Sequence, residues 1–129
     1  IGGTLVAPAG SAVDITLRFL DPVDNNHHDD NPEVARVDLI MGVITGPVAD
    51  PNSDVQPSAA VVARFGPTDW RQDGDYKVID YRLTSLDRDR YLRVRGTNGT
   101  ELEPVVDPRG EDPWSDLWFY ANPIRLRAQ

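Results

Sequence analysis

The sequence predicts a single antiparallel β-sandwich domain, spanning residues 1–129, with seven or eight strands. Apolar and polar residues alternate with a period of two through most segments, as in half-buried strands. Clusters of Gly, Pro, Asn and Asp separate these segments at irregular spacing. No long stretch carries a helical apolar stripe, and the length suits one core rather than two. A small closed barrel is the alternative architecture, because its strands show the same alternation.

Six segments account for most of the predicted strands. In chain order they are Ala12–Phe19, Val34–Thr45, Ala59–Phe65, Tyr76–Leu83, Tyr91–Arg95 and Leu117–Leu126. The second and third are apolar almost throughout, which predicts central strands that are covered on both faces. The last contains Pro123, which has no amide hydrogen to donate, so it requires an edge, a bulge or a break there.

Turn chemistry predicts how two of these segments are bounded. The run Thr97-Asn98-Gly99-Thr100 is typical of a two-residue type I′ hairpin, because Asn and Gly tolerate positive φ. Residues 85–90 are compatible with a short helical turn. The remaining Pro- and Gly-rich runs indicate exposed loops.

Composition narrows the class of protein. The formal net charge of −8 argues against a nucleic-acid partner, since phosphate binding needs a positive surface. No cysteine is present, which excludes disulfides and thiolate metal sites, and no apolar run is long enough for membrane insertion. Twelve arginines against one lysine indicate a GC-rich bacterial source. We expect an exported or cell-surface domain, with the cytoplasm left open, that is processed or excised from a longer protein.

The segment 21–33 is the first candidate site. It contains five acids, three asparagines and two histidines, and it has no Lys or Arg. The carboxylate and amide oxygens of such side chains are the ligands that calcium prefers. The candidate ligands are Asp21, Asp24, Asp29 and Asp30. A solvated connection between strands is the favoured alternative. A transition-metal site is the least favoured, because the adjacent side chains of His27 and His28 do not easily converge on one ion.

Five arginines form the second candidate: Arg82, Arg88, Arg90, Arg93 and Arg95. Alternation places Arg93 and Arg95 on one strand face with Tyr91, where guanidinium groups could bind a carboxylate or phosphate ligand. We favour the alternative that these arginines pair with neighbouring acids, among them Asp80, Asp87, Asp89 or Glu101.

The aromatic terminus is the third candidate. Trp114, Trp118 and Tyr120 could stack on the sugar rings of a carbohydrate ligand. Leu117 and Phe119 alternate with Trp118 and Tyr120, so one pair is expected to enter the core. Packing in the core or against a neighbouring domain is favoured over sugar binding. No standard catalytic motif occurs in the sequence, so we expect a domain that is not an enzyme.

Three segments resemble a known family: 37–40, 91–97 and above all 107–124, which contains Asp116-Leu117-Trp118-Phe119-Tyr120-Ala121-Asn122-Pro123. They resemble the C-terminal region of large bacterial phosphoesterase-type hydrolases, including PHP-class proteins. The resemblance covers the last two thirds of the chain. It implies a β-rich accessory tail whose partner is an upstream catalytic domain of the same protein that holds the metal site.

The expected function is therefore a non-catalytic accessory or interaction module. It would pack on the catalytic domain or contact that domain's substrate or a surface ligand. The alternative is a calcium-dependent carbohydrate-binding module. The third and weakest alternative is a stand-alone hydrolase that uses Asp and His residues.

Overall fold

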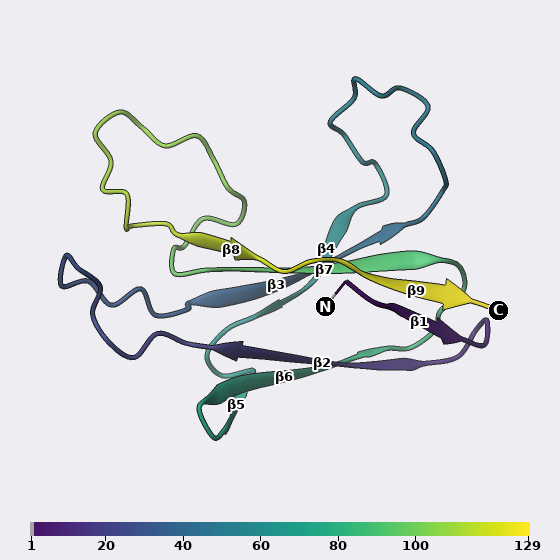
Figure 1. Ribbon diagram of the computed structural model, residues 1–129, viewed down its shortest axis with the longest axis horizontal. Helices are drawn as coiled ribbons and strands as arrows, with labels where there is room; N and C mark the ends of the chain where they lie inside the picture. Colours follow the sequence, from purple (N-terminus) through teal and green to yellow (C-terminus); the bar gives the residue numbers. More distant parts are fainter. Residues whose placement is uncertain (1) are drawn as a thin grey trace.

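The computed structural model describes residues 2–129, which form nine β-strands and no helix (Figure 1). The strands are β1 Thr4–Ala7, β2 Val13–Leu20, β3 Arg36–Val43, β4 Ala60–Phe65, β5 Arg71–Asp73, β6 Tyr76–Leu83, β7 Arg90–Thr97, β8 Trp118–Tyr120 and β9 Ile124–Ala128. They lie in two facing sheets, so the predicted all-β sandwich is confirmed. Neither sheet closes on itself, so the barrel alternative is wrong.

The topology is that of an immunoglobulin-type sandwich. The larger sheet has the order β1-β9-β7-β3-β4, and the smaller sheet has the order β2-β6-β5. Such sandwiches place strands B, E and D in one sheet and strands C, F and G in the other, with C′ beside C in the variable type. Here β2-β6-β5 corresponds to B-E-D, and β9-β7-β3-β4 corresponds to G-F-C-C′. The first strand runs parallel to the last, whereas the other pairs are antiparallel.

The last predicted strand is interrupted at its proline. Both β8 and β9 pair with the same edge of β7, and residues 121–123 separate them. The amide of Ala121 still donates to the carbonyl of Val94 at 2.9 Å, but Pro123 cannot continue the ladder. The predicted break is therefore confirmed.

The core lies between the sheets and is built from the inward residues of the alternating strands. The main cluster of buried residues consists of Val13, Ile15, Leu39, Met41, Leu86, Leu92 and Leu126. Leu86 lies outside any strand and is completely buried at one end of the sandwich. Its amide donates to the carbonyl of Ser11, and its carbonyl accepts from the amide of Gly10, both at 2.8 Å. Residues 85–90 contain no helical turn, contrary to the sequence expectation, because Leu86 is instead bonded to this neighbouring loop.

Two strands were missed by periodicity. β1 and β5 are too short, at four and three residues, to show alternation. The strand at 59–65 was expected to be central, but β4 is the edge of its sheet. Its apolar residues pack inward at Ala63 and Phe65, whereas Val62 is 40% exposed.

The predicted hairpin at Asn98-Gly99 is wrong. The chain does return antiparallel to β7, but only after the long connection 98–117, where β8 pairs Thr97 with Trp118. Gly99 has no positive φ; a Cβ at this position would lie 3.1 Å from the Cβ of Asp116. Close packing, not turn conformation, accounts for this glycine.

Candidate functional site

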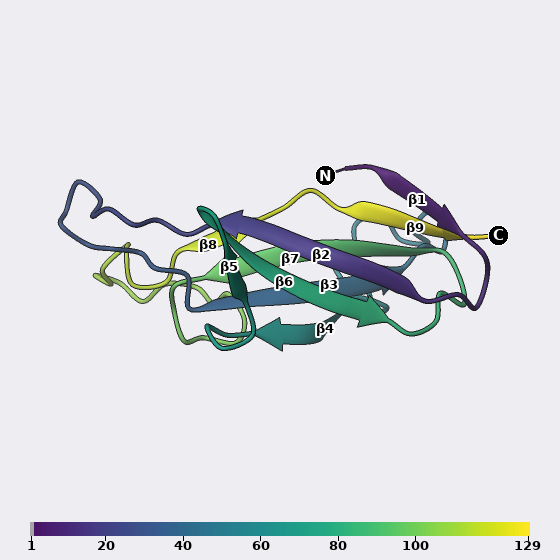
Figure 2. The same cartoon turned by 90° about the horizontal axis from the view of Figure 1, so that it is seen from below.

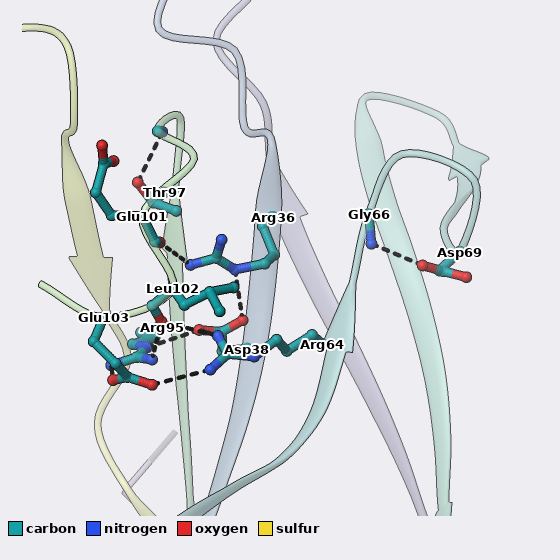
Figure 3. A network of polar contacts seen from close by, with 11 residues as sticks. Arg36, Asp38, Arg64, Gly66, Asp69, Arg95, Thr97, Glu101, Leu102 and Glu103 are labelled. Carbon is teal, nitrogen blue, oxygen red and sulfur yellow. Dashed lines mark hydrogen bonds and ion pairs between the residues drawn. The ribbon is translucent and has the colours of Figure 1, made fainter.

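The outer face of the larger sheet holds a carboxylate enclosed by arginines (Figure 3). Asp38 projects from β3 away from the core, yet it is only 1% exposed. Arg36 donates to its Oδ1 at 2.9 Å, and Arg64 and Arg95 donate to its Oδ2 at 2.8 and 2.9 Å. Because a buried charge is costly unless it is paired, these three guanidinium groups are what allow Asp38 to be buried.

Residues 101–103, which we call the strap, cover this carboxylate. The carbonyl of Glu101 accepts a hydrogen bond from Arg36 at 2.6 Å. The carbonyl of Leu102 accepts two bonds at 3.0 Å from the other two arginines. The strap therefore satisfies the guanidinium donors that Asp38 leaves free, and it fixes the start of the loop 98–117 on the sheet.

Glu103 closes the network with its side chain. Its carboxylate accepts from Arg95 at 2.7 Å and from Arg64 at 3.0 Å. The bond from Arg95, and secondarily that from Arg64, holds the pKa of Glu103 below its ordinary value of 4.5 although burial opposes this. Burial alone would lower the pKa of Arg95, but its bonds to Glu103 and Asp38 raise it. All three nitrogens of the Arg95 guanidinium are occupied, so its part in the predicted anion-binding face is taken by acids of the chain itself.

Trp118 and Tyr120 lie on the same outer face and stack on arginines. The ring of Trp118 lies 5.2 Å from the guanidinium carbon of Arg95, and the ring of Tyr120 lies 5.1 Å from that of Arg93. Trp114 lies in the loop 98–117, where its ring is 5.4 Å from that of His28. Among the described aromatic contacts none joins it to Trp118 or Tyr120, so the three rings do not form one stacked platform. Phe119 packs against Gly96, but 37% of it stays exposed, and neither Leu117 nor Phe119 belongs to a buried core cluster. The expected entry of one pair into the core is therefore wrong.

The other predicted arginines pair with acids. Arg82 on β6 contacts Asp14, its register partner on β2, at 2.7 Å. Arg88 and Arg90 both contact Asp87, at 3.0 and 2.7 Å. The hydrogen bond from Arg90 is the main cause that lowers the pKa of Asp87 below 3.8. Four of the five arginines thus form internal ion pairs, as favoured, whereas Arg93 forms none within residues 2–129. Asp87 was a predicted partner, but Asp14, Asp38 and Glu103 were not.

The acidic segment makes local hydrogen bonds and no metal site. Asp21 accepts the amide of Val34 at 2.8 Å, and Asn26 accepts the amides of residues 28 and 30. Asp29 adopts a φ of 64°, which suits a tight turn. Among residues 2–129, no three His, Asp or Glu side chains are placed to hold a metal ion. The four predicted calcium ligands are thus not brought together.

Two long loops extend beyond the same end of the sandwich. Figure 2 shows the connections 21–35 and 98–117 at this end, with the short β5–β6 turn nearby. The ring of His28 in the first loop lies 5.4 Å from the ring of Trp114 in the second, so the loops touch. Binding residues often gather on such loops, which a rigid sandwich holds in place.

An open cavity of about 380 Å³ lies where these loops leave the sheets, and we call it the end cavity. Its walls are Phe19, Leu20, Pro22, Pro32, Val34, Thr97, Asn98, Leu117, Trp118 and Phe119. The lining is mostly apolar. Two polar atoms of wall residues, Asn98 Oδ1 and Trp118 Nε1, are buried without a hydrogen-bond partner among the described residues. Such atoms are rare in folded proteins.

No family model, curated protein or solved structure matches the chain. The resemblance to phosphoesterase-type hydrolases therefore remains a prediction from its own segments. Within residues 2–129, no helix has the length and apolar character that a membrane span requires.

Sequence reasoning missed the centre of the polar network. Asp38, Arg36, Arg64 and Glu103 were not among the candidate site residues, although one signal was present. Asp38 interrupts the most apolar run of the chain, and an acid inside a central strand needs partners if it is buried. Those partners are Arg36 of β3 itself, Arg64 of β4 and Arg95 of β7. The last two come from other strands, and the strap that covers them is placed by tertiary structure.

Proposed function

We propose that this domain is a non-catalytic interaction module of a bacterial, exported, phosphoesterase-like hydrolase. It packs on the catalytic domain of the same protein or contacts that protein's substrate or a surface ligand. The end cavity is the observation that carries the proposal. Its apolar walls are open to water in the isolated domain, and a partner that covers them is stabilised by burying that surface. Leu20 at its rim is 59% exposed, and the neighbouring Val23 is 84% exposed.

The association with a hydrolase is supported by the resemblance of segment 107–124. That segment contains β8 and supplies three walls of the end cavity, Leu117, Trp118 and Phe119. A run that resembles the tail of these hydrolases and lies at an exposed apolar site supports a tail that docks on another domain.

The test begins with the polypeptide encoded immediately upstream of Ile1. We would express it as a separate protein, titrate it into this domain by calorimetry, and record amide NMR spectra of the domain. An upstream metal-dependent hydrolase that binds and shifts cavity resonances is the expected result. A signal peptide directly upstream, or hydrolysis of bis(4-nitrophenyl) phosphate by the isolated domain with Mn²⁺, contradicts the proposal.

The calcium-dependent carbohydrate-binding alternative has no favouring contact in the described residues. Its acids are dispersed along 21–33, and its aromatic rings lie in two places. The effect of millimolar calcium on the melting temperature of the domain tests it.

A further inference from the structure

We propose that the end cavity and the loops around it bind an extended, basic protein segment that inserts one large apolar side chain into the cavity. This inference rests on the proposed interaction function and deepens it by naming the surface and the chemistry of the partner. It follows from the charge of the loops, the ion pairs they lack, and the walls of the cavity.

The acidity of the chain is concentrated at this end. Loop 21–35 has five acids and no Arg or Lys, and loop 98–117 has six acids against Arg109 alone. Together they carry a formal charge of −10, so the rest of the chain, at −8 overall, carries +2. The sandwich is therefore polarised, with a nearly neutral body and one strongly negative end.

Most of this negative charge is not neutralised by ion pairs within the domain. Of these eleven acids, Glu103 is the one that forms an ion pair in the part of the chain that the structure describes. By contrast, Asp14, Asp38, Asp80, Asp87 and Asp89 on the body each contact an arginine. Unpaired acids on exposed loops attract a basic partner and repel nucleic acids and anionic membranes.

The cavity adds the apolar anchor. Its walls are mainly side chains of Phe, Leu, Pro and Val, and its volume of about 380 Å³ lies in the range of binding pockets. A buried apolar side chain at the centre of a polar rim is the usual source of affinity in protein interfaces.

The experiment is selection of a random dodecapeptide library, displayed on phage, against the immobilised domain. Affinities of the selected peptides are then measured by fluorescence polarisation at low and high salt. We expect the peptides to combine Lys or Arg with one large apolar residue. We expect binding to weaken roughly tenfold between about 50 and 300 mM NaCl, because exposed charges are screened.

Three variants locate the binding. Leu20→Ser removes an exposed cavity wall without opening the core and should weaken binding about fivefold. Asp24→Asn with Glu111→Gln should weaken it by a similar factor. Asp50→Asn with Asp54→Asn removes the same charge from the opposite end, in loop 44–59, and should change the affinity less than twofold.

Several results overturn the inference. The first is that no peptide is enriched over selection on the support without the domain. The second is that the selected peptides are acidic or lack an apolar residue. The third is that the two charge variants weaken peptide binding equally. If the upstream domain binds through another face while the library yields nothing, the inference fails and the proposed function stands. If the library yields basic apolar peptides but the upstream region encodes a signal peptide, the inference stands and the hydrolase association fails.

Discussion

Replacing Asp38 by asparagine tests whether the enclosed carboxylate stabilises the fold. The variant keeps the size of the side chain but removes the charge that three guanidinium groups share. Arg36 and Arg64 are 13% and 31% exposed and can regain water, whereas Arg95 is 6% exposed and retains only Glu103 as a counter-charge. Breaking a buried ion pair by removing one partner costs about 3–5 kcal/mol, so we expect about 3 kcal/mol here.

The measurement is equilibrium unfolding in urea, followed by tryptophan fluorescence. With a slope of about 1.5–2 kcal/mol per molar urea, a loss of about 3 kcal/mol lowers the midpoint by roughly 1.5–2 M. This is a large part of the 5–15 kcal/mol that is typical of the whole stability of a domain.

The matched control is Asp14→Asn on β2. Asp14 also faces outward and also contacts an arginine, Arg82, but the two side chains are 74% and 63% exposed. Exposed pairs contribute about 0–1 kcal/mol, so this variant should move the midpoint by less than about 0.7 M. If Asp38→Asn costs no more than the control, burial of the network does not stabilise the fold and the reasoning is refuted.

Three further predictions concern the strap, the inner face and metal binding. Folding lowers the pKa of Glu103, so its carboxylate stabilises the folded state relative to a Glu103→Gln variant. This difference in unfolding free energy should be complete above pH 4.5 and vanish as the pH falls through the folded-state pKa. A difference that grows on acidification contradicts this. Gly96→Ala places a Cβ against the ring of Phe119 and should lower the free energy of unfolding in urea by about 1–2 kcal/mol. In the control Gly3→Ala the new Cβ meets no neighbour, so the loss should be less than about 1 kcal/mol. Millimolar calcium should leave the melting temperature unchanged within about 1 °C, because segment 21–33 assembles no ligand cluster; a clear rise would restore the calcium site.

The long alternating strands were readable from the sequence because one face of each is buried and the other is not. Ala12–Phe19 and Tyr76–Leu83 were located almost to the residue, and Pro123 marked the break between β8 and β9. Short elements such as β1 and β5 carried no such signal, since they are held by pairing with distant strands. The Asn98-Gly99 turn was misjudged because glycine serves close packing as readily as positive φ.

The candidate site depended more heavily on tertiary structure. Composition alone showed that segment 21–33 is acidic, but not that its loop meets loop 98–117 at one end of the sandwich. Alternation placed Arg93 and Arg95 on one face, yet Arg95 is buried because the strap returns over it.

The sequence by itself determined the all-β class, the main strands and the acidic character of the chain, because alternation, turn residues and charge are local properties. Only the tertiary structure decided the immunoglobulin-type strand order, the enclosure of Asp38 and the end cavity. Each of these joins residues far apart in the chain, and the free energy that selects such contacts comes from burial and charge pairing between them rather than from any single segment.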